Sequence, residues 1–234
     1  TVQGDASSDT SKFGAHVMTM GTGRAKIDGV EFTRVGQKKA AGRYPVHFHQ
    51  LGDGGANSFV KNSSIHHSYN RCLTIHGSNK VQVLNNAAYS APGHCYFLED
   101  GAETGNVLEG NLGFSIRRPA DGDRLLPTDN RPSVFWITHP TNVVRNNVAA
   151  GAEWGVGFWY ALPQKPLGLS SSQTTIFPLR SALGEFSGNL AHSSGETGLD
   201  VDHAAPSTAL PGQFWPTVRW EQLLLHKKAT LRTR

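Results

Sequence analysis

Residues 146–151 read NNVAAG, a short pattern in which Asn or Ser precedes an aliphatic residue and small residues follow. The pattern recurs as SSIHHS at 63–68, NNAAYS at 85–90, GNLGFS at 110–115 and GNLAHS at 188–193. Its aliphatic positions are Ile65, Ala87, Leu112, Val148 and Leu190, so successive repeats lie 22, 25, 36 and 42 residues apart. The first two spacings suit one coil of a solenoid, in which each repeat stacks on its neighbours.

Two long segments explain the wider spacings. Residues 117–132 (RRPADGDRLLPTDNRP) and 162–181 (LPQKPLGLSSSQTTIFPLRS) are rich in turn-forming residues and would be loops inserted into a coil. Between the repeats, segments such as CLTIHG at 72–77, HCYFLED at 94–100 and GLDVDH at 198–203 place apolar residues at every second position. This alternation is typical of strands. Helical periodicity appears only near WEQLLLHKK at 220–228.

The recurring Asn decides between two all-β folds. Asn tolerates a left-handed backbone at a tight corner, and its amide can hydrogen-bond to the equivalent amides above and below it. A β-sandwich would explain the alternation but not the fixed Asn. We therefore predict a right-handed parallel β-helix with inserted loops, as a single domain over residues 1–234. Residues 1–14 and 222–234 are expected to be peripheral, and the chain, which begins without Met, is expected to be a fragment of a longer one.

The composition excludes several classes of protein. With 26 Gly, 12 Pro and 17% charged residues, the chain is turn-rich and globular, which argues against a helix bundle or disorder. It contains no run of about 18 apolar residues, so no membrane span is expected. The formal charge of +4 comes largely from the tail at 226–234 and says little about partners. No phosphate loop or nucleic-acid motif is present, so no nucleic-acid partner is expected.

Stacked coils bring distant residues into columns, because neighbouring strands lie about 4.8 Å apart. We align Val46 and Phe48 with Leu73 and Ile75, and then with Cys95 and Phe97, as inward residues. One outward column is then His47, Thr74, Tyr96, Phe135, Gly157 and Asp200. The other is His49, His76, Leu98, Ile137, Trp159 and Asp202. The inserted loops are expected to fold over this outward face and turn it into a cleft.

Three histidines of these columns form a candidate metal site. His47 and His49 alternate on one strand, and His76 is expected beside His49 on the next coil, so three imidazoles can converge on one ion. Such a set suits zinc or a similar divalent metal. Calcium would instead prefer oxygen ligands, which the segment LEDGAE at 98–103 offers. A polar site without metal and purely structural histidines remain alternatives.

Several long motifs carry a resemblance to a known family. They are GRYPVHFHQLGD (42–53), SSIHHSYNRCLTIHGSN (63–79), GHCYFLEDGAETGN (93–106), LLPTD (125–129) and NNVAAGAEWGVGFWY (146–160). Together they resemble the β-helix region of the cell-migration-inducing and cell-surface hyaluronidases, and fibrocystin-like proteins share parts of it. The resemblance implies a parallel β-helix, a secreted or cell-surface setting, and depolymerisation of hyaluronan or another acidic polysaccharide. A non-catalytic module for carbohydrate binding or surface display is the alternative.

Glycoside hydrolysis needs two carboxyl groups that flank the scissile bond. Glu99 and Asp100 are the first candidates for an acid or a base, with His76 and His94 as further catalytic residues. Asp200 and Asp202 form a second outward pair, which we assign to substrate binding.

β-Elimination from a uronic acid is the alternative reaction. It needs a cation that neutralises the substrate carboxylate and a base, and His76, Tyr96, Arg43 and Arg71 are placed for these roles. The sequence does not separate hydrolase from lyase.

Aromatic and sulfur-containing residues complete the predictions. Tyr96 and Trp159 either stack on sugar rings as substrate-binding residues, together with Arg43 and Arg71, or pack beneath the inserted loops. Cys72 and Cys95 are interpreted as buried thiols.

Overall fold

A computed structural model describes residues 1–203, 224–226 and 231–233, and its strands form three parallel sheets. Sheet 1 comprises β1 (Val2–Gln3), β4 (Glu31–Thr33), β7 (Ser64–His66), β10 (Ala87–Tyr89), β13 (Leu112–Ile116), β16 (Val148–Ala152), β19 (Leu190–His192) and β21 (Leu224–His226). Sheet 2 comprises β2 (Val17–Met20), β5 (Val46–Gly52), β8 (Leu73–Ser78), β11 (Tyr96–Leu98), β14 (Ser133–Ile137), β17 (Val156–Leu162), β20 (Thr197–His203) and β22 (Leu231–Thr233). Sheet 3 comprises β3 (Lys26–Asp28), β6 (Phe59–Lys61), β9 (Gln82–Leu84), β12 (Val107–Glu109), β15 (Val143–Arg145) and β18 (Glu185–Ser187).

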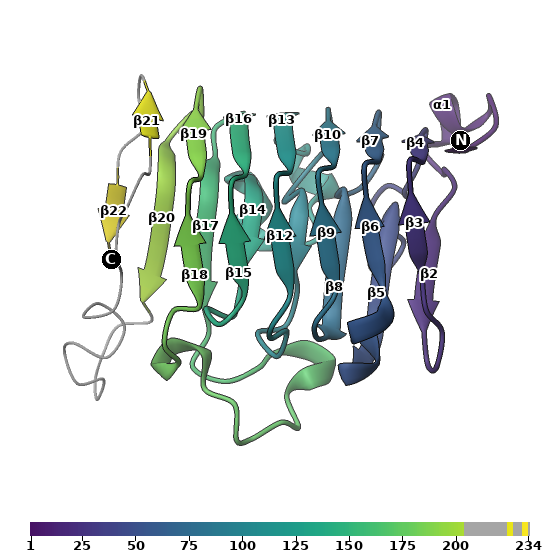
Figure 1. Cartoon of the computed structure of the whole chain (residues 1–234). Helices are drawn as coiled ribbons and strands as arrows, with labels where there is room; N and C mark the ends of the chain where they lie inside the picture. The colour runs from purple at the N-terminus through teal and green to yellow at the C-terminus, as the bar shows by residue number, and fades with distance from the viewer. Residues whose placement is uncertain (204–223, 227–230, 234) are drawn as a thin grey trace.

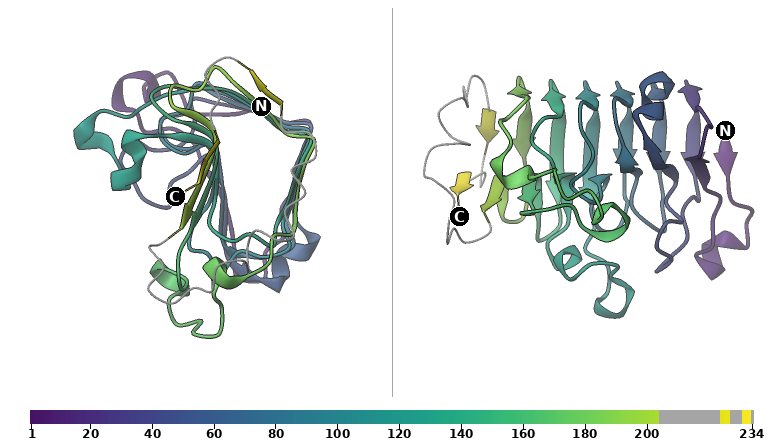
Figure 2. Two further views of the ribbon diagram at one scale, coloured as in Figure 1. Left: turned by 90° about the vertical axis from the view of Figure 1, so that its left-hand side faces the viewer. Right: turned by 90° about the horizontal axis from the view of Figure 1, so that it is seen from below.

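From β2 to β19, each coil contributes one strand to each sheet, and the coils stack side by side along one axis (Figure 1). Viewed down that axis, the three sheets enclose a common core (Figure 2, left). The predicted parallel β-helix is thus confirmed. Helical structure is confined to short turns: α1 (Ser8–Ser11), η1 (Asp53–Asn57), η2 (Asp121–Asp123), η3 (Pro127–Asn130), η4 (Gly168–Ser170) and η5 (Pro178–Arg180).

A buried amide ladder fixes one corner of the helix. Asn86 donates to the side-chain oxygen of Asn111 at 2.9 Å, Asn111 to Asn147 at 3.0 Å, and Asn147 to Asn189 at 3.1 Å. The left-handed backbone falls on the preceding residue instead, as at Asn146 (φ 54°). The ladder is confirmed. One residue of each pair forms the ladder and the residue before it has the left-handed backbone, whereas the sequence pattern assigned both features to a single Asn.

The predicted register is right at the first coils of sheet 2 and wrong by one residue at β11 and β14. Val46 pairs with Leu73 and Phe48 with Ile75, as expected. Tyr96, not Cys95, then pairs with Leu73, and Leu98 pairs with Ile75. Since side chains alternate between faces, this slip moves Tyr96 into the core. The inward column runs Val46, Leu73, Tyr96, Phe135, Phe158 and Leu199.

A shift of one residue also separates the predicted and observed alignments of the repeats on sheet 1. Ala87 pairs with Ser64 rather than with Ile65, and Ala88 is the residue that stacks on Ile65. The inward positions of this sheet are small in the later coils, as with Ala149 and Ala191, which are fully buried.

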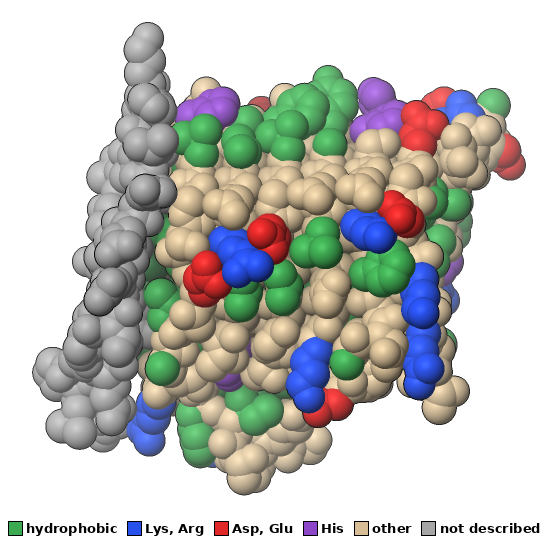
Figure 3. All heavy atoms as spheres, in the orientation of Figure 1, with side chains coloured by type: hydrophobic (Ala, Val, Ile, Leu, Met, Phe, Trp, Pro, Cys, Tyr) green, Lys and Arg blue, Asp and Glu red, His purple; other side chains and the backbone are tan. Residues whose placement is uncertain are grey.

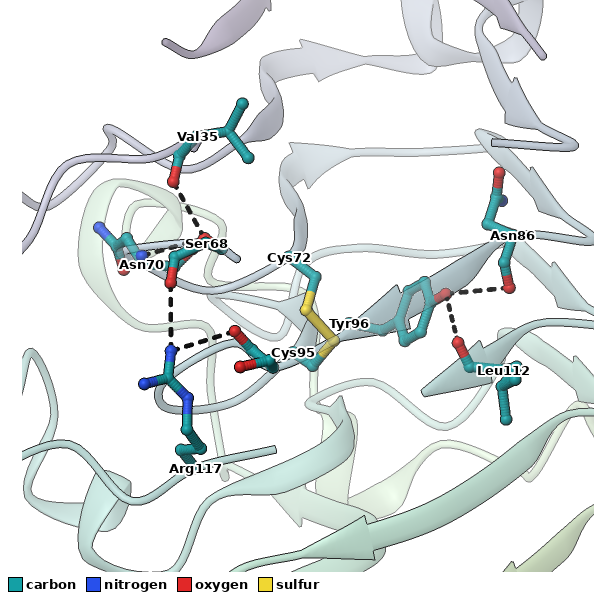
Figure 4. Close-up of a disulfide and its surroundings, with 10 residues drawn as sticks. Val35, Ser68, Asn70, Cys72, Asn86, Cys95, Tyr96, Leu112 and Arg117 are labelled. Atoms are coloured by element: carbon teal, nitrogen blue, oxygen red, sulfur yellow. Dashed lines mark hydrogen bonds between the residues drawn. A yellow bond between two sulfur atoms is a disulfide. The ribbon is translucent and has the colours of Figure 1, made fainter. Parts of the chain in front are cut away.

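Cys72 and Cys95 form a disulfide between neighbouring coils, so the predicted free thiols are wrong (Figure 4). Both residues are fully buried, as expected, but their Cα atoms lie only 4.6 Å apart because the coils stack in register. Figure 4 also shows the Tyr96 hydroxyl, which donates to the backbone oxygens of Asn86 (3.3 Å) and Leu112 (3.1 Å). Tyr96 is 0% exposed and cannot stack on a sugar.

The two inserted segments protrude from the solenoid, at different corners (Figure 2). The insert at 117–132 connects β13 to β14, and the insert at 163–184 connects β17 to β18. Sheet 3, which faces the viewer in Figure 3, carries small groups of opposite charge among uncharged side chains. Neither insert crosses that sheet. Both instead contact residues of sheet 2 or its adjoining turns.

The end of the chain continues the stacking where it is described. β21 pairs with β19, and β22 pairs with β20. Leu224–His226 is therefore a strand, although helical periodicity marked this segment, and its flanks at 204–223 and 227–230 lie outside the described residues. Within the described part, no helix is long and apolar enough to cross a membrane.

Candidate functional site

Three histidines meet on the outward face of sheet 2. His49 of β5 pairs with His76 of β8, and His47 lies two residues earlier on the same side of β5. The ring centroids of His47 and His49 are 5.0 Å apart, those of His49 and His76 are 5.0 Å apart, and those of His47 and His76 are 5.8 Å apart. The shared location predicted from the sequence is therefore observed, and we call these residues the histidine trio.

His47 is the most buried member of the trio, at 1% exposure. Its Nδ1 lies 2.9 Å from the carbonyl oxygen of Gly42, which can only accept, so Nδ1 carries the proton and Nε2 the lone pair. That Nε2 atom is buried and has no hydrogen-bond partner. Burial lowers the pKa of His47 to about 3, and the neighbouring His49 and His76 add to the effect. His47 is thus a neutral imidazole with a free nitrogen.

His76 is held by a carboxylate on each side. Its Nε2 donates to Asp100 Oδ2 at 2.8 Å, and its Nδ1 lies 3.5 Å from Glu99 Oε2. Burial alone would lower the pKa of His76, but the hydrogen bond with Asp100 and the charges of Glu99 and Asp100 outweigh it and raise the pKa. His76, Glu99 and Asp100 therefore form one electrostatic unit at the end of the trio.

The two carboxyl groups of this unit differ in their electrostatic environments. Burial raises the pKa of Glu99, whose Oε1 accepts from the Tyr44 hydroxyl at 3.3 Å and whose Oε2 has no hydrogen-bond partner. Burial acts on Asp100 in the same direction, but its bonds to His76 and Ser170 prevail and lower the pKa. Neighbouring carboxyl groups with opposite pKa shifts are typical of an acid and its ionised partner.

The turn that carries these carboxylates is held from both ends. Glu103 is fully buried and accepts from the backbone N–H groups of Gly77, Asp100 and Gly101 at 2.7–3.0 Å. The insert at 163–184 closes the other side, where the Ser170 N–H donates to Asp100 Oδ2 at 3.0 Å. Both oxygens of Glu103 and the Oδ2 atom of Asp100 therefore accept from protein donors.

Two predicted site residues lie in a separate buried network. Arg71 is 1% exposed and pairs with Asp129 of the 117–132 insert. His94 is fully buried, and its two ring nitrogens lie 3.0 Å from the Ser133 hydroxyl and 3.1 Å from that of Thr128. Neither Arg71 nor His94 can reach a substrate, because the insert packs over them. The assignments to substrate binding and to catalysis are corrected to a structural role.

The aromatic row on this face is also covered. Trp159 points outward as predicted, but it is 3% exposed, and the Arg131 guanidinium lies 4.5 Å from its ring centroid. Asp200 is fully buried and pairs with Arg131 at 2.9 Å, and Asp202 accepts from Trp159 Nε1 at 2.9 Å. Asp200 thus holds the insert through Arg131, and Trp159 and Asp200 are not available to a sugar, whereas Asp202 is half-buried and accepts from Trp159.

A cationic cavity of about 430 Å³ lies at the flank of sheet 2, where the 117–132 insert meets the corners of the early coils. Its four acids are already engaged: Asp123 by Lys38 at 2.8 Å, Asp129 by Arg71, Asp9 by the Tyr69 hydroxyl at 2.7 Å, and Glu153 by the backbone N–H of Arg118 at 3.2 Å. In the part of the chain that the structure describes, the following basic lining residues have no carboxylate partner: Lys12, Lys39 and Arg117.

The loop at 37–43 connects this cavity with the histidine trio. Lys38 and Lys39 line the cavity, whereas Gly42 contacts His47. Arg43, predicted to bind substrate, is exposed on this loop, with its guanidinium 3.5 Å from His16. The loop at 37–43 thus carries basic residues both at the cavity and near the trio.

No sequence pattern assigned a role to Tyr44 and Gly42, which contact Glu99 and His47, or to Arg131, which covers Trp159. Pro45 interrupts the alternation just before β5, and this signal could have indicated that Tyr44 leaves the inward column. No local pattern marks Arg131, whose role depends on how the insert folds back.

Comparison with protein families gives a match to the CEMIP beta-helix model over residues 12–199. The chain belongs to the CEMIP beta-helix family. It is 43% identical to mouse Fibrocystin-L over 180 residues, 77% of this chain and 4% of that protein. It is 37% identical over 233 residues to human cell surface hyaluronidase CEMIP2, covering 86% of this chain and 16% of that protein.

Human cell migration-inducing and hyaluronan-binding protein is a further relative, 32% identical over 229 residues, with 86% of this chain and 17% of that protein covered. This member of the CEMIP beta-helix family therefore spans less than a fifth of the length of the relatives that it matches. The family names a fold that occurs both in hyaluronidases and in Fibrocystin-L.

Proposed function

We propose that this chain binds an acidic polysaccharide such as hyaluronan and hydrolyses it at the cluster of His76, Glu99 and Asp100. The observation that carries the proposal is the contact of Glu99 and Asp100 with the two nitrogens of one imidazole, together with the opposite pKa shifts of the two carboxyl groups. The names of two relatives, a hyaluronidase and a hyaluronan-binding protein, support the same substrate class.

Glu99 is suited to act as the general acid. Burial favours its protonated form, and its side chain remains 23% exposed, so a glycosidic oxygen can approach it. Oε2 has no hydrogen-bond partner but is itself buried, so the carboxyl group would have to turn toward the exposed part of the side chain to protonate a leaving group. The Tyr44 hydroxyl fixes the other oxygen and thereby orients the carboxyl group.

Asp100 and His76 serve the water side of the reaction. Asp100 stays ionised and holds the Nε2 proton of His76, so Nδ1 keeps its lone pair toward Glu99. An imidazole oriented in this way can take a proton from water. Hydrolysis therefore needs no residue beyond this unit, whereas β-elimination would need an accessible cation such as Arg43.

Binding of the substrate is assigned to the cationic cavity. Lys12, Lys39 and Arg117 lack carboxylate partners within the described residues, and Arg117 Nη2 is oriented by the backbone oxygens of Ser68 and Ser90 at 3.4 and 3.1 Å. Uronic carboxylates at intervals along a glycan match such spaced cations.

A secreted or cell-surface setting fits this substrate. The Cys72–Cys95 disulfide is of the kind that persists in oxidising compartments. We expect secreted protein to contain no titratable thiol, whereas two free thiols per chain in such material would contradict this setting.

The test is incubation of the purified chain with hyaluronan and with a neutral glucan. We expect new reducing ends from hyaluronan alone, without the ultraviolet absorbance of an unsaturated uronic acid. That absorbance would instead mark a lyase. If hyaluronan binds without being cut, the chain is a non-catalytic module, for which the similarity to Fibrocystin-L is the supporting observation.

A further inference from the structure

The histidine trio leaves buried nitrogen atoms without partners. His47 Nε2 and His49 Nδ1 are both buried and make no hydrogen bond, and His76 Nδ1 has no closer partner than Glu99 Oε2 at 3.5 Å. Burying a polar atom without a partner is unfavourable. Two such atoms on neighbouring rings, with a ring nitrogen of His76 within 4.8 Å of them, indicate a bound ion that accepts nitrogen lone pairs.

We propose that His47, His49 and His76 bind one divalent transition-metal ion, with zinc as the best fit. One nitrogen from each residue lies within 4.8 Å of the others. Zinc–nitrogen bonds are about 2.0–2.1 Å long, which places nitrogens on one ion roughly 3.3 Å apart. Small ring rotations close that difference, because all three side chains already project from one face of sheet 2.

The groups behind the trio hold the rings as metal ligands are usually held. Gly42 accepts the Nδ1 proton of His47, and Asp100 accepts the Nε2 proton of His76. A carbonyl or carboxylate on the far nitrogen fixes the tautomer and turns the other nitrogen toward the metal. Both anchors come from different segments, a loop and a turn, and both aim the free nitrogen into the same space.

The chemistry of the donors selects the ion. Imidazole nitrogens suit zinc, copper, nickel and iron, whereas calcium and magnesium take oxygen ligands. Of the nearby oxygens, both of Glu103 and Oδ2 of Asp100 are occupied by backbone N–H groups and by His76. Three histidines with a fourth position open toward Glu99 also match the donor set of catalytic rather than structural zinc.

This inference goes beyond the proposed hydrolysis, since the trio can hold an ion whether or not the chain cuts a glycan. If both hold, His76 Nδ1 binds the ion and no longer serves as the base; the ion would then activate the attacking water, and Glu99 remains the acid.

The test uses the 234-residue chain after dialysis against a chelator. Zinc is added back and metal content is measured after gel filtration, and Co²⁺ titration is followed by its visible absorption. We expect one zinc per chain and a Co²⁺ spectrum of nitrogen ligation, with no displacement by excess Ca²⁺. A chain that retains no stoichiometric zinc and gives only the Co²⁺ spectrum of the hydrated ion would overturn the proposal.

Variants assign the ion to the trio. His49→Gln is the mildest change because His49 is partly exposed, and we expect it to weaken zinc binding by more than about 100-fold. Asp100→Asn removes an anchor but no ligand, so a loss of roughly 10–100-fold is expected. His192→Gln, on sheet 1, is the matched control and should bind as the parent does. Unchanged affinity in folded His49→Gln would contradict the site, and far-ultraviolet circular dichroism checks the fold.

Discussion

His49 and His76 lie directly opposite each other on β5 and β8, with ring centroids 5.0 Å apart. One coil of the solenoid separates them, and the register of that coil is what makes them neighbours. The site is therefore a property of the stacking, because no short sequence motif contains all of its members. Changes that loosen the stacking of coils are expected to disturb the site from a distance.

The disulfide between Cys72 and Cys95 is one such element. It closes a loop over a sequence separation of 23 and ties the coil of β8 to that of β11. The Cys72→Ala/Cys95→Ala variant should lose about 3 kcal/mol of unfolding free energy, mainly because the unfolded chain gains freedom. Urea unfolding measures this loss. Reduction of the parent with dithiothreitol should produce a similar shift, and an unchanged midpoint in both would contradict the role.

The amide ladder stabilises the opposite corner. Asn111 bridges Asn86 and Asn147, and Asn111→Ala removes the side-chain partners of the buried Asn86 N–H and of the Val83 carbonyl oxygen. We expect a loss of about 1–3 kcal/mol in unfolding free energy. Asn57, which is exposed, provides the control Asn57→Ala, for which little change is expected. Equal effects of the two substitutions in urea unfolding would refute the ladder's contribution.

The Arg71–Asp129 pair predicts a pH dependence of stability. Burial opposes ionisation of Asp129, but Arg71, His94 and backbone donors outweigh it and lower the pKa below its usual 3.8. The stabilisation is therefore fully present above pH 3.8 and is lost as pH falls through the lower pKa of the folded state.

Asp129→Asn is expected to cost about 3–5 kcal/mol at neutral pH, since it leaves the Arg71 charge buried without its partner. The variant should also lose part of the acid sensitivity of the parent between neutral pH and pH 3. Urea midpoints at several pH values measure both effects. Parallel curves for parent and variant would show that the pair does not contribute.

The cationic cavity predicts salt-dependent binding of acidic glycans. Lys39→Gln and Arg117→Gln should each weaken hyaluronan binding by about 10-fold, since each removes a charge-assisted hydrogen bond. The effect should shrink at high ionic strength, because exposed charges are screened. Lys26→Gln on sheet 3 is the matched control. Calorimetry measures the binding. If Lys39→Gln and Arg117→Gln bind hyaluronan as tightly as the control does, the glycan binds elsewhere.

Much of the fold was predictable because its signals are local and repeated. The spacing of the Asn-containing repeats and the alternation between them predicted the coils, and the inserts were recognised by composition. The shift of one residue at β11 could not be predicted, because HCYFLED alternates equally well in either phase. Glu99 could have indicated the correct phase. In the predicted phase its carboxylate would point into the core, like Phe97, which is unfavourable for a charged group.

The candidate site was predictable only where one coil follows the next without an insertion. His47, His49, His76, Glu99 and Asp100 come together as expected. Arg71, His94 and Trp159 were assigned to the open face, because no sequence pattern indicates which part of the face an insert covers. Arg131 and Asp129, both in the insert at 117–132, bury these three residues.

The most direct test of the account is the rate of reducing-end release from hyaluronan by Glu99→Gln across pH, with Glu185→Gln on sheet 3 as control. Burial raises the pKa of Glu99, so its acid form should persist above the usual pH range, and the parent rate should fall as pH rises through that pKa. We expect Glu99→Gln to lose at least about 100-fold in rate and the Glu185 variant to match the parent. Cleavage by Glu99→Gln at the parent rate, with the same pH profile, would contradict the account.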